Sequence, residues 1–464
     1  MSKLLFINSN RGKAAAIFQK YFYTERKILK NGEIIFMCPK KDCYASIKID
    51  EHRRTVLEIR GEHTRHLQLT DSEIEKHEIK NTIKRKATEE ISTRPNKIIR
   101  KAISEADHVT LNDISNYRQH IYRKRRKVLS VLPKSYDEAI SQLLTSQDTL
   151  LTFKKEQFLY INDDKVVSLT CKTNLKTLCD NSEYILADGT FRYCPRYFYQ
   201  LYTIHIYKNG LYLPLVYYFL TGKTTNDYIG MWQSLINLCN SNNLVFEPKS
   251  IRVDFEKSAH LAIQHSFPLC NIYGCRFHLG QAWYRKLNQD FPYLRNEYKA
   301  NTEVGKWIKY FFGLSFISPE EVSDVFCELI EIAPNSDVLH FSDYIYDNYI
   351  QENCLFPPEM WAEIPSTLPK TTNGPEAFHS HYNAQFYSTH PSIWKVIETL
   401  KEIQTETYVK IKDISGGIYH LQRAPERQKL EYIQKHWLKY TTGEISRLHF
   451  VRIMGHYNVP SIYL

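Results

Sequence analysis

The sequence predicts a mixed α/β protein. Short strands alternate with helical patterns over residues 184–287, a β-rich segment precedes them, and a basic helical segment lies between the two. With 464 residues, the chain is longer than one ordinary domain. Its 43% hydrophobic and 24% charged residues are typical of a globular protein, so we expect several folded domains.

The first 70 residues predict a small β module. Three short strands separated by polar turns are expected, at residues 34–37, 44–49 and 55–59. Two thiolates and two imidazoles, the ligand set of a tetrahedral zinc site, come from Cys38, Cys43, His63 and His66. Folding of so small a module would then depend on the metal. The alternative is that two cysteines are buried and two histidines lie on a surface turn.

The residues around these four side chains form a recognisable series. It comprises Phe6, Ser9, Arg11, Gly12, Lys13, the aromatic run 21–23, Phe36, Cys38, Cys43 and His66. The series resembles the FLYWCH zinc-finger family. It differs in having Phe36 where the family favours tryptophan, and two residues instead of one between the histidines. The resemblance implies a FLYWCH-type finger that binds Zn²⁺ at residues 1–70.

The positive charge of the chain is concentrated in the next segment, residues 71–150. The whole protein has 61 lysines and arginines against 51 aspartates and glutamates. Residues 80–134 contain 15 of the former and five of the latter, which is the entire excess. Such a segment attracts phosphate backbones, whereas the charge-balanced remainder cannot hold nucleic acid by bulk charge. We therefore expect this segment to bind DNA or to link DNA-binding parts.

Three short helices are expected in the basic segment, at residues 84–91, 96–106 and 111–129. They would be compatible with a helix-turn-helix arrangement. The third helix carries a run of five cations, Arg123, Lys124, Arg125, Arg126 and Lys127. We expect this run to contact DNA. A nuclear import signal and a solvated helix face are the two alternatives.

The pattern is most regular in the part that begins near residue 155. Strands are expected at residues 184–187, 200–207 and 211–220, and the Lys-Asn-Gly turn at 208–210 makes the last two antiparallel. A helix opened by Asn226 follows. The remaining elements are a strand at 250–253, a helix at 258–265, a strand at 271–275 and a helix at 279–287. This β-β-β-α-β-α-β-α order is the ribonuclease H-like succession.

Three carboxylates lie at the ends of these elements. Asp188 and Asp254 end the first and fourth strands, and Glu376 follows a proline that can open a helix. Each alone has an ordinary explanation: a turn residue, a helix cap, and a favourable charge in a first helical turn. Together they suit phosphodiester chemistry with two Mg²⁺ or Mn²⁺ ions, which prefer oxygen ligands. We expect Asp188 to bridge both ions, with Asp254 and Glu376 each completing one side.

Four blocks around these acids have a recognisable sequence. They are ADGTF at 187–191, DFEKSA at 254–259, GCRFH at 274–278 and TNGPEAFH at 372–379. In order and spacing they resemble the Mutator-like element (MULE) transposases, over residues 110–415, and a FLYWCH-type finger is a common companion in that family. The resemblance implies a DDE catalytic triad of Asp188, Asp254 and Glu376. It also implies a largely helical insertion at about residues 291–371.

Cys275 and His278 match the Cys-x-x-His pair of the same family. Such a pair could bind zinc with partners elsewhere, or His278 could contact the scissile phosphate. The alternative is a buried cysteine and a polar histidine at a helix start, since two ligands do not close a zinc site. We expect His278 to be an auxiliary residue of the catalytic site.

The composition predicts neither secretion nor membrane insertion. The first residues have no cleavable signal pattern, and the longest apolar run, 211–220, contains Pro214. Ten cysteines scattered along the chain favour a reducing compartment. Four parts are therefore expected: a finger at 1–70, a basic helical segment at 71–150, a catalytic domain at 151–420 and a helical extension at 421–464.

The expected function is a DNA transposase that cuts element ends and joins 3′ hydroxyls to target DNA in the nucleus. Its partners would be the terminal repeats, the target DNA and a second copy of the chain, because two element ends must be handled together. One alternative is a domesticated descendant that binds DNA as a regulator without transposing. Another is a ribonuclease H-like nuclease that acts on RNA–DNA hybrids.

Overall fold

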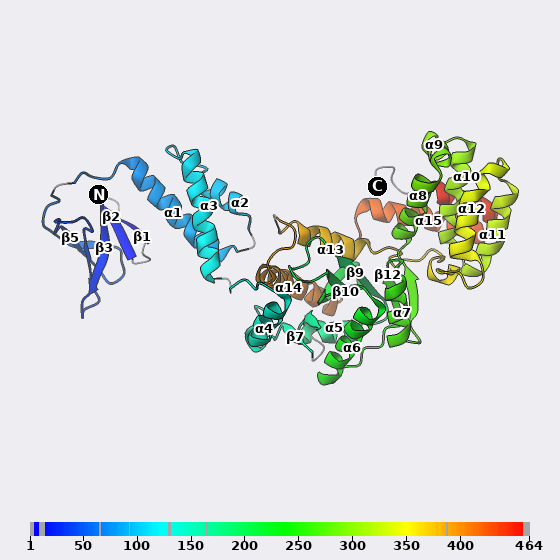
Figure 1. The fold of residues 1–464 in the computed structure, drawn as a ribbon, viewed down its shortest axis with the longest axis horizontal. Helices are drawn as coiled ribbons and strands as arrows, with labels where there is room; N and C mark the ends of the chain where they lie inside the picture. The colour runs from blue at the N-terminus through cyan, green and yellow to red at the C-terminus, as the bar shows by residue number, and fades with distance from the viewer. Residues whose placement is uncertain are drawn as a thin grey trace. The chain divides into compact units, whose positions relative to one another are not determined.

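A computed structural model describes residues 4–8, 14–64, 66–91, 93–128, 131–162, 166–386 and 388–457 (Figure 1). Ser9, Arg11, Gly12 and Lys13 of the finger motif, and the expected end of the third helix at residue 129, lie outside these ranges. The chain divides into two compact units, residues 1–132 and 133–464.

The boundary between the units falls earlier than the expected one near residue 150. Helix α4 (Tyr136–Ser146) lies within the expected basic segment but packs inside the second unit. There Gln142 accepts a hydrogen bond of 3.2 Å from the Trp394 indole, and the Tyr136 ring contacts Phe198 edge to face. These contacts attach α4 to the second unit, although α4 lies within the expected basic helical segment.

The first unit begins with a six-stranded antiparallel sheet in which neighbouring strands follow chain order. The strands are β1 (Leu5–Asn8), β2 (Ala14–Phe18), β3 (Tyr21–Ile28), β4 (Ile34–Met37), β5 (Ser46–Ile49) and β6 (Val56–Arg60). The three expected strands correspond to β4, β5 and β6. The sequence did not predict β2, which is rich in alanine, a residue depleted in strands, and is held by burial of Ala15 and Ala16.

Three helices complete the first unit: α1 (Asp71–Glu89), α2 (Pro95–Ala102) and α3 (Leu111–Val128). They share an apolar core that includes Ile83, Ile98 and Ile121. Helix α1 begins earlier than the expected residue 84. Its start is fixed by a capping box, because the Thr70 side chain accepts from the Glu73 backbone while the Glu73 side chain accepts from the Thr70 backbone.

The second unit contains a seven-stranded mixed sheet in the order β13-β12-β9-β10-β11-β8-β7. Its strands are β7 (Leu159–Ile161), β8 (Val167–Leu169), β9 (Ile185–Thr190), β10 (Gln200–Lys208), β11 (Leu211–Leu220), β12 (Ser250–Val253) and β13 (Asn271–Gly274). The hairpin strands β9, β10 and β11 are antiparallel, whereas β9, β12 and β13 are parallel. The mixed α/β fold and the predicted order of elements from β9 onward are confirmed.

Both faces of this sheet are covered by helices (Figure 1). An apolar cluster joins the strands to α5 (Lys172–Asp180), α6 (Thr225–Ser241) and α7 (Lys257–Ser266). Because side chains alternate along a strand, Thr203 and Tyr217 point away from that cluster, toward α13 (Asn373–Asn383) and α14 (Ile393–Ser415). Among the described residues, no helix is both long and apolar enough to cross a bilayer.

A second apolar core lies outside the sheet. Helix α8 (Arg276–Asp290) leads into the segment expected to be a helical insertion, which contains α9 (Pro292–Ala300), α10 (Glu303–Phe311), α11 (Pro319–Glu331) and α12 (Leu339–Ile345). Helices α15 (Ala424–Thr441) and α16 (Arg447–Tyr457) close the same core through Ile433, Phe450 and Met454. Glycine allows the close approach of α16, because a Cβ on Gly313 would lie 2.0 Å from the Val451 carbonyl oxygen.

Candidate functional site

Two of the predicted acids lie on neighbouring strands. Asp188 belongs to β9, and Asp254 directly follows β12. The parallel pairing of Ile251 with Ile185 and of Arg252 with Leu186, continued by two residues, brings Asp254 level with Asp188. Both acids line one cavity of about 50 Å³. Strand register, which follows from the hydrophobic pattern of the two strands, therefore brings these acids together.

Glu376 reaches the same place from helix α13. The ring of His278 lies between Glu376 and Asp254: its Nδ1 is 2.6 Å from Asp254 Oδ1, and its Nε2 is 3.5 Å from Glu376 Oε1. The structure thus brings together all four residues predicted for the catalytic site. Each comes from a different element, β9, the end of β12, α8 and α13.

Burial removes two carboxylates of the cluster, Asp254 and Glu376, from water and thereby shifts their pKa values. Burial, with a smaller contribution from Asp188, raises the pKa of Asp254 although His278 opposes it. Burial and the charge of Asp188 also raise the pKa of Glu376. Burial alone would lower the pKa of His278, but Asp254 and Cys275 raise it to about 11. His278 is therefore a cation between two acids at neutral pH.

Cys275 links the start of α8 to the start of α13, because it immediately precedes α8 and contacts Thr372, which immediately precedes α13. It is fully buried and accepts hydrogen bonds of 3.2 Å from both the backbone nitrogen and the hydroxyl of Thr372. The Thr372 hydroxyl also lies 3.2 Å from Glu376 Oε1. The donor atoms of Asp254, Cys275 and His278 lie within 4.8 Å of one another, which makes these three a candidate metal-binding group. Cys275 and His278 thus lie beside Asp254, one of the three predicted acids.

His379 contacts Asp188, the remaining acid of the cluster. The sequence did not predict a role for His379. Its Nδ1 lies 2.9 Å from Asp188 Oδ2, and the backbone nitrogen of Gly189 donates to Asp188 Oδ1 at 2.8 Å. His379 follows Glu376 by three residues, so both lie on one face of α13. That spacing was the available signal, within a block that the sequence had already singled out.

Glu256 is a fourth acid beside the cluster. It lines the same small cavity as Asp188 and Asp254, and its Oε2 accepts a hydrogen bond of 3.2 Å from the Tyr228 hydroxyl. Burial raises its pKa, with a further contribution from Asp254. The sequence placed Glu256 inside a motif but assigned it no role.

A buried ion cluster anchors the chain where it returns from the insertion toward α13. Arg252, two residues before Asp254, is fully buried and pairs with Glu363. Glu363 also pairs with Lys370 at 2.6 Å. The Arg252 guanidinium further donates to the Gly274 carbonyl at 2.6 Å. Because a buried charge is costly without a partner, these pairs fix the path of the segment that precedes Glu376.

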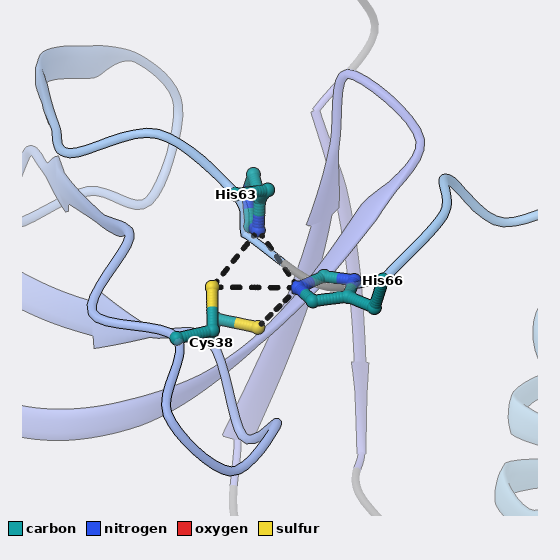
Figure 2. Close-up of side chains that lie close together, drawn as sticks. Cys38, His63 and His66 are labelled. Atoms are coloured by element: carbon teal, nitrogen blue, oxygen red, sulfur yellow. Dashed lines mark hydrogen bonds between the residues drawn. The ribbon is translucent and has the colours of Figure 1, made fainter.

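The four predicted ligands in the first unit come together in one place. Cys43 Sγ lies 3.5 Å from His63 Nδ1 and 3.3 Å from His66 Nε2, which in turn lies 3.5 Å from Cys38 Sγ. The two ring nitrogens are 3.3 Å apart. Figure 2 shows the side chains of Cys38, His63 and His66 pointing toward a common point. All four donor atoms lie within 4.8 Å, which makes a candidate Cys₂His₂ metal site.

The two histidines of this site are held by neighbouring groups. The Tyr23 hydroxyl lies 2.7 Å from His63 Nε2, and the Tyr21 ring stacks on His63 with centroids 3.5 Å apart. The His66 Nδ1 faces the Leu67 carbonyl oxygen at 3.3 Å. Burial lowers the pKa of His63, which keeps it neutral and able to bind a metal. Burial would raise the pKa of Cys43, but hydrogen bonds with the backbone of Ala45 and Thr64 and with the side chains of His66 and Cys38 together lower it to about 7.

The basic run on α3 is not a uniform surface, and the prediction is corrected at Arg125. This side chain is buried and donates to the carbonyl oxygens of Ala87, Glu90 and Thr93 at 3.2, 2.7 and 2.6 Å. It therefore caps the end of α1 instead of facing solvent. The other four cations are exposed, and they are Arg123, Lys124, Arg126 and Lys127.

A second group of cations faces this helix from α1. Helical spacing places Lys80 and Lys84 on one side of α1, and α1 packs against α3 through Ile83 and Ile121. Burial lowers the pKa of Lys84, and the charges of Lys80 and Lys124 lower it further. Burial and the cations Lys80, Lys84 and Arg123 lower the pKa of His120 to about 4. His120 is therefore a neutral residue among cations, and we call Lys80, Lys84, Arg123 and Lys124 the cation patch.

Comparison with known families identifies a similarity over part of the second unit. Residues 184–282 match the MULE transposase domain. The matched stretch runs from β9 into α8, so it includes Asp188, Asp254 and His278, and it ends before Glu376. No curated protein matches the chain. The match supports a transposase-type function for this domain, and with it DNA as a partner, whereas the FLYWCH-type finger is not identified and stays a prediction.

Removing the Glu363 carboxylate should destabilise the second unit. Glu363→Ala leaves the buried Arg252 and the half-buried Lys370 without this counter-charge, which costs about 3–5 kcal/mol. Urea unfolding should show a midpoint well below that of the wild type. The control is Glu359→Ala, which removes an exposed carboxylate from the same segment and should leave the midpoint unchanged. Equal midpoints for the two variants would show that the cluster does not anchor the segment.

Proposed function

We propose that the protein is a DNA transposase of the Mutator-like type, which cuts DNA at element ends and joins the freed 3′ hydroxyls to target DNA. The observation that carries the proposal is the convergence of Asp188, Asp254 and Glu376 in a domain similar to the MULE transposase domain. The strand order β13-β12-β9-β10-β11, with three antiparallel and two parallel strands, supports a ribonuclease H-like fold.

The three acids suit Mg²⁺ or Mn²⁺. All their donor atoms are carboxylate oxygens, which these ions prefer. The raised pKa values of Asp254 and Glu376 express repulsion between like charges and loss of water, and a divalent cation would relieve both. Bound ions would supply activation of the attacking oxygen and stabilisation of the leaving oxygen. We assign Asp188, Asp254 and Glu376 as the DDE triad and as the ligands.

His278 has a separate role in this proposal. Its protonated ring already contacts Asp254 and Glu376, and it retains about a fifth of its side-chain surface exposed. A fixed cation at the edge of an acidic site offsets the repulsion that a phosphodiester would otherwise meet there. His278 therefore holds a proton and a positive charge beside the position of the scissile phosphate.

We assign recruitment of DNA to the first unit. The neighbouring positive charges of the cation patch repel one another. A phosphate backbone bound to the patch would reduce this repulsion. The exposed cations Arg126 and Lys127 lie in the last turn of the same helix α3 and carry the same charge without contributing to these pKa shifts. We also propose that the protein acts in the nucleus, a proposal that rests on DNA as its partner.

We assign Zn²⁺ to the Cys₂His₂ site. A tetrahedron with Zn–N bonds of about 2.0–2.1 Å and Zn–S bonds of about 2.3 Å has edges of roughly 3.3–3.8 Å. The donor atoms of Cys43, His63 and His66 are separated by 3.3–3.5 Å, which fits these edges. The contacts of Tyr23 and Leu67 with the outer ring nitrogens are those expected of metal-binding histidines.

Cleavage should require the metal and the triad. Full-length protein with duplex DNA carrying terminal repeats and Mg²⁺ or Mn²⁺ should release nicked or excised product, seen on denaturing gels. Asp188→Asn should lower the rate by at least about 100-fold and leave DNA affinity intact, because the lost group is a metal ligand. Asp180→Asn, the same change at an exposed position on α5, is the control.

Two results would contradict this assignment. Equal cleavage by wild type and Asp188→Asn would remove the triad from the chemistry. DNA binding without any cleavage, at a locus without flanking repeats, would favour the domesticated regulator.

Two lysines of the cation patch should matter more for DNA affinity than the end of the basic run. Lys80→Gln with Lys84→Gln should flatten the slope of log affinity against log salt by about 2, since each lysine neutralises about one phosphate. Arg126→Gln with Lys127→Gln removes the same charge and should change the slope by less than half as much. Fluorescence anisotropy of the full chain across a salt series measures both. Similar slopes would mean that only net charge holds DNA.

The full-length protein should contain one equivalent of zinc, bound in the first unit. Cys38→Ser or His66→Ala should remove it, as measured by elemental analysis, and should lower the melting temperature of the first unit, because metal binding contributes to folding. Cys327→Ser, a change at an exposed cysteine, should leave the zinc content at one. Full zinc content in the His66→Ala protein would exclude the four-ligand assignment.

A further inference from the structure

A chain of polar side chains runs from Asp188 into the interior of the sheet. His379 Nδ1 lies 2.9 Å from Asp188 Oδ2, and His379 Nε2 lies 3.0 Å from the hydroxyl oxygen of Thr203. That oxygen lies 2.8 Å from His205 Nε2. Thr203 is the antiparallel neighbour of Asp188 on β10, and Thr203 and His205 are fully buried. The sequence analysis assigned none of these three residues a role.

Burial determines which groups donate and which accept in this series of hydrogen-bonded side chains. His205 Nδ1 has no hydrogen-bonding partner among the residues that the structure describes, and burial lowers the pKa of His205 well below its usual value. The ring is therefore neutral, and its hydrogen is best placed on Nε2, where it donates to Thr203. The Thr203 hydroxyl in turn faces His379 Nε2 at 3.0 Å and the backbone oxygen of Asp188 at 3.2 Å.

In either arrangement of these hydrogens, Asp188 Oδ2 accepts a hydrogen bond from His379 Nδ1. If Thr203 donates to His379 Nε2, the His379 hydrogen lies on Nδ1 and points at Asp188 Oδ2. If Thr203 instead donates to the backbone oxygen at 3.2 Å, Nδ1 must still carry a hydrogen, because a carboxylate oxygen 2.9 Å away only accepts. The other carboxylate oxygen, Oδ1, accepts from the Gly189 backbone. Each oxygen of Asp188 thus has one protein donor, and its remaining lone pair stays available to a metal.

We propose that His379 is a positioning residue that fixes the Asp188 carboxylate for metal binding, with Thr203 and His205 holding its ring in place. The inference rests on the proposed metal-dependent function. His379 is 6% exposed, so it lies behind the carboxylate and does not face DNA. Partners of this kind orient metal ligands, and their loss commonly lowers metal affinity by about 10–100-fold.

Packing alone does not account for the hydrogen-bonded series of His379, Thr203 and His205. His379 sits beside Phe378 and near Tyr382 in a region where an apolar side chain could fill the same volume. Two buried imidazoles and a hydroxyl lose hydration there, a cost that their mutual hydrogen bonds offset only in part. The series ends at Asp188, and we explain it by the orientation that it gives to this carboxylate. Helix α13 then supplies both a metal ligand, Glu376, and the group that orients another.

The test compares two substitutions of similar size. His379→Asn keeps an amide nitrogen at the position of Nδ1, whereas His379→Leu has no donor there. Mn²⁺ affinity of the full-length protein, measured by calorimetry without DNA, should fall by about 10–100-fold in His379→Leu and by much less in His379→Asn. Thr203→Val, which keeps the shape but removes the hydroxyl, should give an intermediate loss. His381→Leu, on an exposed part of α13, is the matched control.

The outcomes separate the possible roles. Wild-type Mn²⁺ affinity in folded His379→Leu protein would overturn the inference while leaving the triad intact. Equal losses in His379→Asn and His379→Leu, together with equal falls in melting temperature, would assign His379 a packing role and also overturn it. A wild-type protein that binds no Mn²⁺ would overturn the proposed function first, and this inference with it.

Discussion

The packing of helix α13 against the sheet is the constraint on which the site depends. Strand register alone unites Asp188 and Asp254, but the third acid arrives after a long helical insertion. Three contacts hold α13 in place: the hydrogen bonds between Thr372 and Cys275, the pairing of Arg252 with Glu363, and the contact of His379 with Asp188. Each joins segments that are far apart in sequence, so the geometry of the acids is a product of the whole second unit.

The local parts of this architecture could be predicted from the sequence. Alternating and continuous apolar runs define β4, β11 and β12, whose bounds agree with the prediction, and a carboxylate that ends a strand is visible without a structure. The Cys₂His₂ ligands were found because ligand types are few and their spacing is short. The DDE chemistry, the zinc and the ribonuclease H-like fold stay predictions that the geometry supports.

The residues that sequence analysis missed act across long separations. Arg125 belongs to a basic run and looks like its neighbours, yet three carbonyls of α1 and the segment after it surround it. Lys80 and Lys84 join the cation patch only because α1 packs on α3. Arg252 sits in an apolar strand with no local sign of its distant partner Glu363. In each case the deciding fact is which charged or polar group becomes buried beside which other.

The apolar core shared by the insertion and helices α15 and α16 depends on residues that are synthesised after all three clustered acids. Phe450, Val451 and Met454 complete the apolar core of a segment that leads directly to Glu363 and then to Glu376. A nascent chain that has reached residue 420 already contains all three acids but lacks these side chains. Residues 424–457 therefore have to be synthesised before the apolar core around the insertion is complete. Until then, a growing chain contains Asp188, Asp254 and Glu376 without the full core that adjoins the segment leading to Glu376.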